Sequence, residues 1–496
     1  MVTGAGARAT ADPVVVVGAG PAGLTAAREL DRAGVDFVVL EMDGTVGGLS
    51  RTVRHGGYRF DIGGHRFLTK VPAVEEMWRE VLGSELVRRE RRSRILYRGR
   101  YFDYPLRIGT VLRGLGPAYA ARAVLSFAAA RLAPRRPERS MEDWVVNRFG
   151  DFLYRAFFKT YTEKVWGVPC AEIGAEWAAQ RIRGLSFARA VGAMLPGGGR
   201  GIKSLAESFH YPRLGPGQLW EAVAGGLGEP HRLHLHTRVV SIRHAGGRVR
   251  SVVSRNGRGE VSTPAAHVVS SMPLRDLVEA LDPPPPDAVL QAARALRYRD
   301  FVTVALVVDR PGLFPDQWLY VHDPALRVGR IQNYGNWSPD LVGEPARSLL
   351  GLEYFCFEGD GLWTLPDGEM AALARREVET LGIAPAASVR EAMVVRMRHA
   401  YPVYDAGYAE RLAVIRGWLQ RLANLHPVGR NGLHRYNNQD HSMLTAMLAV
   451  RNILGERHDV WAVNADCEYL EEARVELRAA APGRVSAPPP RLEPAA

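Results

Sequence analysis

Six residues near the start of the chain, Gly18-Ala19-Gly20-Pro21-Ala22-Gly23, could bind a phosphate group. They stand between an apolar stretch, residues 13–18, and a helix that the pattern predicts over residues 22–33. Gly18 allows a tight turn, Gly20 lets the backbone approach a pyrophosphate, and Gly23 lets the helix pack closely on the strand. The backbone amides at the start of the helix would then bind the phosphates, aided by the helix dipole.

An acidic residue completes this motif. A second apolar stretch, residues 35–40, ends at Glu41, where a carboxylate hydrogen-bonds the ribose hydroxyls of an adenosine. The order strand, glycine turn, helix, strand and acid predicts a dinucleotide site. Two further glycine pairs follow, Gly47-Gly48 before Leu49 and Gly63-Gly64 before His65. Glycine-rich segments soon after the ribose acid are more typical of FAD proteins than of NAD dehydrogenases.

The composition sets the class of protein. The chain has 496 residues, of which 47% are hydrophobic and 24% are charged, so disorder throughout, a collagen-like chain and a small disulfide scaffold are excluded. Three widely separated cysteines fit a reducing compartment and form no metal-ligand spacing. We find neither a membrane-spanning apolar run nor a signal peptide at the N-terminus, and expect a cytoplasmic protein.

The charge is strongly basic. The 64 lysines and arginines exceed the 53 acidic residues, giving a formal net charge of +11. This reflects either biased codon usage or a positive field that attracts anionic ligands such as nucleotides. No basic helix or aromatic-basic RNA motif is found, so we expect no nucleic-acid partner.

The alternation of strand-like and helix-like stretches predicts an α/β fold. We expect residues 233–242, 249–253 and 267–271 to form one small sheet, and residues 301–308 and 348–357 to belong to a second. Residues 408–422 and 442–454 are predicted helices. The Ala/Arg-rich stretch 119–132 could lie on a membrane surface, but we expect it to pack against a neighbour. The predicted organisation is a disordered tail (1–12), a discontinuous FAD-binding Rossmann-like domain (13–70, 205–275 and 400–478), a mainly helical insertion (71–204), an antiparallel β-sheet substrate domain (276–399) and a second tail (479–496).

Four stretches resemble the FAD-binding superfamily that contains amine oxidases, protoporphyrinogen oxidases and UDP-galactopyranose mutases. They are the glycine turn with Glu41, the segment Gly63-Gly64-His65-Arg66-Phe67, the segment Tyr161-Thr162-Glu163-Lys164-Val165-Trp166-Gly167 with the later Arg181, and residues 428–440. The last three are most similar to the mutases. Asn437 and Asn438 depart from the Tyr-Asp of the bacterial mutase pattern, which leaves the nucleotide base and the sugar configuration open.

The resemblance, together with the glycine motif, assigns the site residues. Cofactor contacts are expected at Gly18, Gly20, Ala22, Gly23, Glu41, Gly48, Leu49, Gly64, His65, Arg430, Asn438 and Asp440. Catalytic roles are expected for His65, beside the flavin, and for Arg181 and Arg299, which would bind the diphosphate. Arg299 is chosen only for its place before a strand. Substrate contacts are expected at Tyr161, Trp166, Arg181, Asn333, Tyr334, Tyr401 and Tyr436, with Tyr404 a further candidate for the tyrosine pair that holds the diphosphate. No metal site is expected.

The function that this resemblance implies is a flavin-dependent mutase. It would interconvert the pyranose and furanose forms of a UDP- or GDP-linked, galactose-like hexose and would need reduced FAD. The alternative is an FAD-dependent oxidoreductase that acts on an amine, a porphyrin-like ring or a sugar. The oligomeric state is left open.

Overall fold

The computed structural model describes residues 12–104, 116–175, 207–228 and 232–464. Its first layer is a five-stranded parallel sheet with the order β20-β13-β1-β2-β9. These strands are β1 (Val14–Val17), β2 (Phe37–Leu40), β9 (Leu233–His234), β13 (His267–Ser270) and β20 (Leu425–Pro427). Every residue of the central strand β1 is buried, as expected for an all-valine strand covered on both faces.

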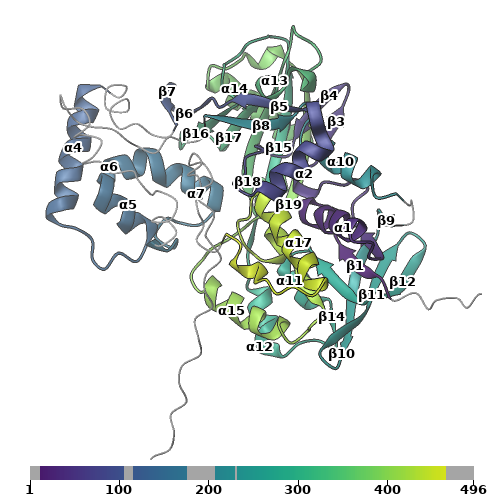
Figure 1. The fold of residues 1–496 in the computed structure, drawn as a ribbon. Helices are drawn as coiled ribbons and strands as arrows, with labels where there is room; N and C mark the ends of the chain where they lie inside the picture. The colour runs from purple at the N-terminus through teal and green to yellow at the C-terminus, as the bar shows by residue number, and fades with distance from the viewer. Residues whose placement is uncertain (1–11, 105–115, 176–206, 229–231, 465–496) are drawn as a thin grey trace, which may run out of the picture.

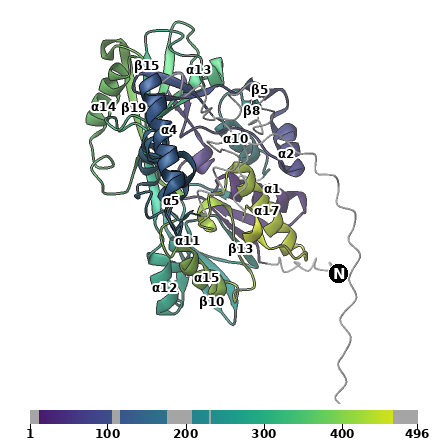
Figure 2. The same ribbon diagram turned by 90° about the vertical axis from the view of Figure 1, so that its left-hand side faces the viewer.

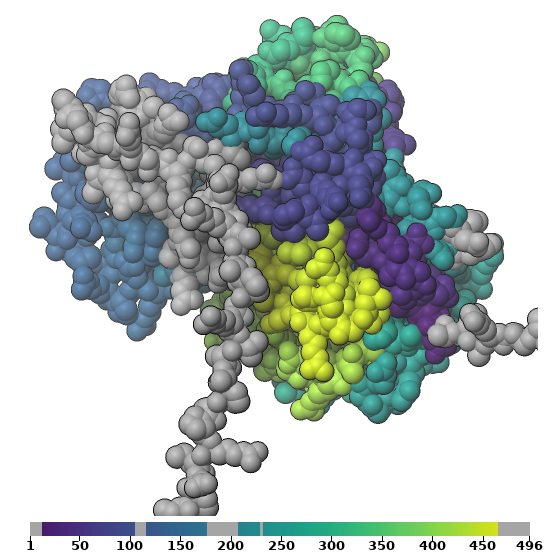
Figure 3. All heavy atoms as spheres, in the orientation of Figure 1, coloured from purple at the N-terminus to yellow at the C-terminus, as the bar shows by residue number. Residues whose placement is uncertain are grey.

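Two helices from opposite ends of the chain pack together on this sheet. They are α1 (Pro21–Arg32) and α17 (Gln439–Ile453), purple and yellow in Figures 1 and 3. Their apolar residues share one core with β1, β2 and β13. The predicted helices 22–33 and 442–454 are therefore both present. The helices α2 (Pro72–Leu82) and α10 (Gly217–Gly225) extend the same core.

One strand prediction is wrong. We expected residues 267–271 to lie in a small sheet with residues 233–253, but β13 pairs in parallel with β1 at the centre of the first sheet. The strand β9 also joins that sheet, at its edge beyond β2. A separate four-stranded sheet contains β10 (Arg238–Ala245), β11 (Arg248–Asn256), β12 (Gly259–Pro264) and β14 (Leu281–Asp282).

The second large layer is a seven-stranded sheet with the order β19-β15-β18-β17-β16-β6-β7. Its strands are β6 (Ser93–Tyr97), β7 (Arg100–Asp103), β15 (Tyr298–Val308), β16 (Trp318–Val321), β17 (Arg330–Asn333), β18 (Ser348–Cys356) and β19 (Val389–Pro402). All neighbours are antiparallel except β6 and β16, which are parallel. Alternate residues of β15 face α14 (Asp367–Thr380) on one side and the short helix α13 (Tyr334–Trp337) on the other.

A helical lobe lies beside the seven-stranded sheet, at the left of Figure 1. It contains α4 (Pro117–Leu132), α5 (Met141–Phe149), α6 (Asp151–Leu153), the π-helix η3 (Tyr154–Lys159) and α7 (Thr160–Trp166). Residues 71–204 are not helical throughout, because β5 (Leu86–Glu90), β6 and β7 come from them, and β6 and β7 complete the seven-stranded sheet. The domain boundaries otherwise remain predictions.

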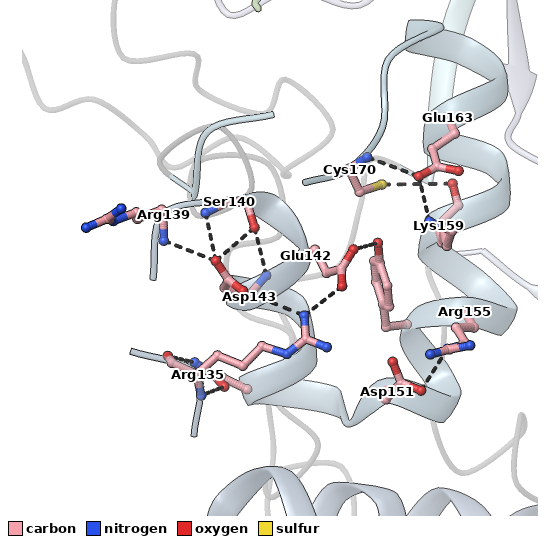
Figure 4. A network of polar contacts seen from close by, with 12 residues as sticks. Arg135, Arg139, Ser140, Glu142, Asp143, Asp151, Arg155, Lys159, Glu163 and Cys170 are labelled. Carbon is pink, nitrogen blue, oxygen red and sulfur yellow. Dashed lines mark hydrogen bonds and ion pairs between the residues drawn. The ribbon is translucent and has the colours of Figure 1, made fainter. Parts of the chain in front are cut away.

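Polar contacts fix the lobe helices to one another (Figure 4). The Tyr154 hydroxyl donates to Glu142 at 2.8 Å, and Arg135 donates to the same carboxylate at 2.7 Å. On the other side of the network, Glu163 accepts from both the Lys159 ammonium and the Cys170 amide. Burial raises the pKa of the Cys170 thiol to about 12, so this cysteine is an uncharged packing residue at neutral pH.

The remaining elements connect these layers. They are the hairpin β3 (Thr52–His55) and β4 (Tyr58–Asp61), β8 (Ser208–Pro212), and the helices α11 (Leu274–Glu279), α12 (Asp287–Arg294), α15 (Tyr408–Leu419) and α16 (Gly429–Gly432). No helix among the described residues is long and apolar enough to cross a membrane. The α/β class, with a dinucleotide-type parallel sheet, a helical insertion and a largely antiparallel second sheet, is confirmed.

The turn between β1 and α1 depends on a close backbone contact. A Cβ atom on Gly23 would lie 1.8 Å from the Gly18 carbonyl oxygen. We therefore expect Gly23→Ala to lower the free energy of unfolding by about 3 kcal/mol, because the helix must move away from the turn. Urea denaturation measures this change, with Gly225→Ala as the control, since a Cβ there meets no atom within 4 Å. Equal stability of the two variants would contradict the argument.

Candidate functional site

Glycine loops meet at the carboxyl ends of the parallel strands. The Gly47 amide donates to the Ala19 carbonyl at 2.8 Å, and a Cβ on Gly48 would lie 3.2 Å from the Gly20 Cα. Gly18, with a φ of +96°, leaves no room for a side chain beside Ser271. Ligands of open α/β sheets bind at this edge, where α1 also presents its N-terminal amides.

The predicted ribose acid lies in this turn. Glu41 is buried, and its carboxylate accepts from the Ala19 amide at 2.6 Å and from the Asp43 amide at 2.8 Å. Burial raises the pKa of Glu41, and these two amide bonds oppose that shift. A carboxylate has about four acceptor positions, so two remain for hydroxyl donors.

A second turn from the C-terminal part of the chain reaches the same edge. Gly429, with a φ of +82°, packs so closely on Ala22 that a Cβ would lie 3.1 Å from the Ala22 side chain. The Gly429 amide is held by Thr445 of α17 at 2.9 Å. The next residue, Arg430, is thereby placed beside the glycine turn of α1.

Several buried polar atoms around these loops have no hydrogen-bond partner within the described chain. They are His65 Nδ1, Gln332 Oε1, Asp440 Oδ2 and both amide atoms of Gln439. Buried polar groups are nearly always paired in folded proteins. The orphaned atoms and the side-chain-free glycine turns therefore fit a large polar ligand such as a dinucleotide. Asn438 is the N-cap residue before α17 and is exposed, and Leu49 packs beside the lobe core.

A cluster of two arginines and aromatic rings lies beyond the loops; we call Trp166, Arg330, Tyr401, Arg430 and Tyr436 the arginine–tyrosine cluster. The Tyr401 and Tyr436 rings stack with centroids 5.4 Å apart, and the Arg430 guanidinium carbon lies 5.2 and 5.1 Å from these centroids. The Trp166 ring lies 5.6 Å from Tyr436. The cluster joins α7, β17, β19 and α16, which are distant in sequence.

Arg330 is fixed by a buried ion pair. It donates to the fully buried Glu353 at 2.7 Å and to the Tyr401 hydroxyl at 2.9 Å, while Gln332 donates to the other oxygen of Glu353. Burial lowers the pKa of Arg330, but the charge of Glu353 more than offsets this and holds the pKa well above its ordinary value. The guanidinium is thus permanently charged and held in one orientation.

Arg430 has no carboxylate partner among the described residues. Its hydrogen bonds go to the carbonyl oxygens of Asn437 at 2.7 Å and Ala400 at 2.9 Å. Its positive charge is therefore not neutralised locally. The same charge is felt at His65, where burial first, then Arg430 and Arg330, lower the pKa to about 3. His65 is uncharged at neutral pH.

Arg299 does not have the predicted clamp position. Its guanidinium is buried and donates to the carbonyls of Lys164, Val165 and Phe355 at 2.9–3.2 Å. It binds the C-terminal end of α7, where unpaired carbonyls attract a cation. Arg299 thus positions Trp166 and is not itself directed into the cluster. Arg181, the other expected clamp, lies outside the described residues.

Asn333 and Tyr334 also differ from the prediction. The Asn333 amide donates to the Phe314 carbonyl, and the buried Tyr334 hydroxyl donates to the Asp61 carbonyl. Both serve packing. Because side chains alternate along a strand, Arg330 and Gln332 share the face opposite Asn333. The alternation of side chains along this strand would have selected Arg330 and Gln332 instead of Asn333 and Tyr334.

Tyr161 and Lys164 belong to the α7 motif. The Tyr161 ring stacks on His322 with centroids 4.7 Å apart, so one of its faces is already covered. The Lys164 ammonium donates to the carbonyls of Val321, Asp323 and Val328, and burial lowers its pKa to about 8. Like Arg299, Lys164 attaches α7 to the seven-stranded sheet. The Tyr404 hydroxyl accepts a hydrogen bond from the Tyr436 amide, so Tyr404 fixes the position of Tyr436 in the cluster.

Comparison with known proteins places this arrangement among flavoproteins. The sequence model of the family described as flavin-containing amine oxidoreductases matches residues 21–434. A Mycobacterium tuberculosis protein, AofH, whose name assigns it to the flavin-containing monoamine oxidases, is 30% identical over 297 residues. That alignment covers 56% of this chain and 61% of AofH, so the chain spans less than two thirds of this relative.

Solved structures share the fold. Reduced UDP-galactopyranose mutase superposes with a TM-score of 0.79 at 20% identity, covering 92% of this chain and 98% of that one. A protein from Exiguobacterium sp. 255-15, named as a protoporphyrinogen oxidase, gives a TM-score of 0.67 at 18% identity, covering 89% and 98%. At these identities the likeness establishes the fold and leaves the reaction to be argued from the site.

The buried His322, which stacks on Tyr161, makes the free energy of unfolding dependent on pH. Burial lowers its pKa to about 3, whereas an unfolded histidine titrates near 6.5. The unfolded chain therefore binds more protons between these values, and stability is lost as the pH falls below about 6.5. We expect His322→Phe, which keeps an aromatic ring against Tyr161, to reduce this loss by up to about 3 kcal/mol at pH 4. Denaturation at pH 7.5 and pH 4 measures the difference; parallel pH profiles of variant and wild type would contradict it.

Proposed function

The chain belongs to the flavin-containing amine oxidoreductase family, and on that premise we propose that it is a mutase that interconverts the pyranose and furanose forms of a nucleotide-linked hexose. Its cofactor is FAD. The observation that carries the proposal is the arginine–tyrosine cluster, in which two guanidinium groups flank the stacked Tyr401 and Tyr436. The similarity of fold to UDP-galactopyranose mutase supports it.

The charge of the cluster favours a diphosphate. Only one carboxylate, Glu353, pairs with the two arginines in the described chain, so the cluster carries an excess positive charge. Guanidinium groups bind phosphate oxygens in a bidentate manner, and phenol hydroxyls add further donors. A protonated amine would be repelled by the same charges. The cluster therefore suits an anionic nucleotide better than a cationic amine.

Each residue would have a definite task. The glycine turns and α1 would bind the cofactor's pyrophosphate, and Glu41 its ribose. When bound and reduced, FAD supplies a nucleophilic nitrogen for exchange at the anomeric carbon. Arg330 and Arg430 would hold the diphosphate while its bond to the sugar is broken, so that the same phosphate can return.

The aromatic residues and His65 would complete the site. Trp166, fixed by Arg299 at the end of α7, would contact the nucleoside, and the free face of Tyr161 would be available for stacking. His65, uncharged at neutral pH, would hydrogen-bond the cofactor or the sugar through its orphaned Nδ1.

An FAD-dependent oxidoreductase is the second candidate. It is favoured by the 30% identity with AofH, a protein named as a monoamine oxidase, and by the description of the family. An amine oxidase would reduce its flavin with substrate and pass the electrons to an acceptor. A mutase would begin and end with the flavin reduced.

An anaerobic turnover assay separates the two candidates. The enzyme is incubated with UDP- and GDP-linked galactose-type sugars, with and without dithionite, and the products are separated by chromatography and weighed by mass spectrometry. We expect an isomer of unchanged mass that forms only when the flavin is reduced. Flavin reduction by an amine, without isomer from any nucleotide sugar, would instead support the oxidoreductase.

Arg330 is the residue whose change tests the diphosphate role. We expect Arg330→Lys to lower kcat/KM by about 100-fold, or about 3 kcal/mol, because lysine keeps the charge next to Glu353 but loses the planar fork. Steady-state kinetics with the active nucleotide sugar measure the change. Arg94→Lys is the matched control, since Arg94 pairs bidentately with Asp316 on the same sheet, outside the cluster. Equal kcat/KM values for the two variants would refute the role.

A further inference from the structure

The helix α4 exposes large apolar side chains. Leu132 is 87% exposed and Leu125 is 69% exposed, and Val124 and Tyr119 on the same helix are 47% and 37% exposed. Leu125 and Leu132 are seven residues apart, two helical turns, and therefore lie on one face. The helix packs against the lobe as expected, but these four side chains remain on its exposed side.

The opposite side of α4 packs within the lobe. Ala123 and Ala130 are buried and belong to the lobe core with residues of α5 and η3. In Figure 1 α4 lies at the outer edge of the lobe, and in Figure 2 it faces the viewer in front of the other helices. The exposed face is thus turned away from the two sheets.

The surroundings of α4 are positively charged. No acidic residue occurs within Pro117–Leu132. Arg122, Arg131, Arg136 and Arg139 are exposed and form no ion pair with a carboxylate in the described chain. By contrast, Arg135 is paired with Glu142, and Arg148 with Glu138. Figure 4 shows the Arg139 guanidinium directed away from Asp143.

We propose that α4 and the loop that follows it, residues 117–139, dock on the anionic surface of a lipid membrane. Exposed leucines beside unpaired arginines are the features that let a helix bury its apolar side chains at the headgroup boundary while its cations contact anionic lipids. A second copy of the chain is disfavoured, because a two-fold contact through α4 would bring the same unpaired arginines together. The inference goes beyond the proposed function and does not rest on it.

Vesicle flotation tests the proposal with the full chain. We expect the protein to float with vesicles of phosphatidylglycerol and phosphatidylcholine, and at least tenfold less with phosphatidylcholine alone or in 0.5 M salt. The double variant Leu125→Glu with Leu132→Glu should lower binding to anionic vesicles at least tenfold. Arg131→Gln with Arg136→Gln should weaken binding and reduce its dependence on salt.

Matched controls remove the effect of an added charge. Val261 of β12 and Leu454 after α17 are each 53% exposed, so Val261→Glu with Leu454→Glu makes the same chemical change elsewhere, and binding should be unchanged. Leu125→Ser with Leu132→Ser serves if the glutamate variant does not fold by circular dichroism. Absence of flotation, or equal flotation of the α4 and control variants, would overturn the proposal. The proposal would also be overturned if the wild-type protein is a dimer by light scattering, does not bind vesicles, and becomes a monomer in the α4 variants.

Discussion

The pairing of one fully buried carboxylate, Glu353, constrains the whole candidate site. A charge without solvent must be neutralised by close donors, and in the described part of the chain Arg330 and Gln332 on the neighbouring strand β17 provide them. Because these two residues are two apart, both project from the same face, and Arg330 is brought to Tyr401. The stacked pair Tyr401 and Tyr436, and Arg430 over it, are arranged around that point.

The lobe is joined to the site by cations that bind carbonyl oxygens rather than carboxylates. Arg299 from β15 and Lys164 of α7 together hold the end of α7 against the sheet. Neither is free to bind substrate, yet both determine where the Trp166 ring lies. In the motif around Trp166, the Trp166 ring faces the cluster, and Lys164 together with Arg299 fixes its position.

Local patterns predicted the geometry of the glycine turn with Glu41 well and that of the arginine–tyrosine cluster less well. The turn at Gly18, the helix after it and Glu41 are close in sequence, so their geometry follows from the steric rules for glycine and from the strand–turn–helix order. Arg330, Glu353 and Tyr401 become neighbours only through strand pairing, which one sequence does not encode in any short window. The same reason explains the misplaced strand 267–270, whose partner lies some 250 residues earlier. Arg299 was chosen for its place before a strand, and its use for binding carbonyl oxygens depends on where α7 ends.

The position of β6 has a consequence for the order in which the protein folds. This strand, residues 93–97, pairs in parallel with residues 318–321, and the helical lobe is inserted in the chain between them. During synthesis, β6 cannot pair with β16 until residues 318–321 have been made, when about two thirds of the chain has been synthesised. Non-local pairing of this kind is slow, and an unpaired strand edge promotes aggregation. The seven-stranded sheet is therefore a late product of folding, and N-terminal fragments that end within the lobe would keep that edge open.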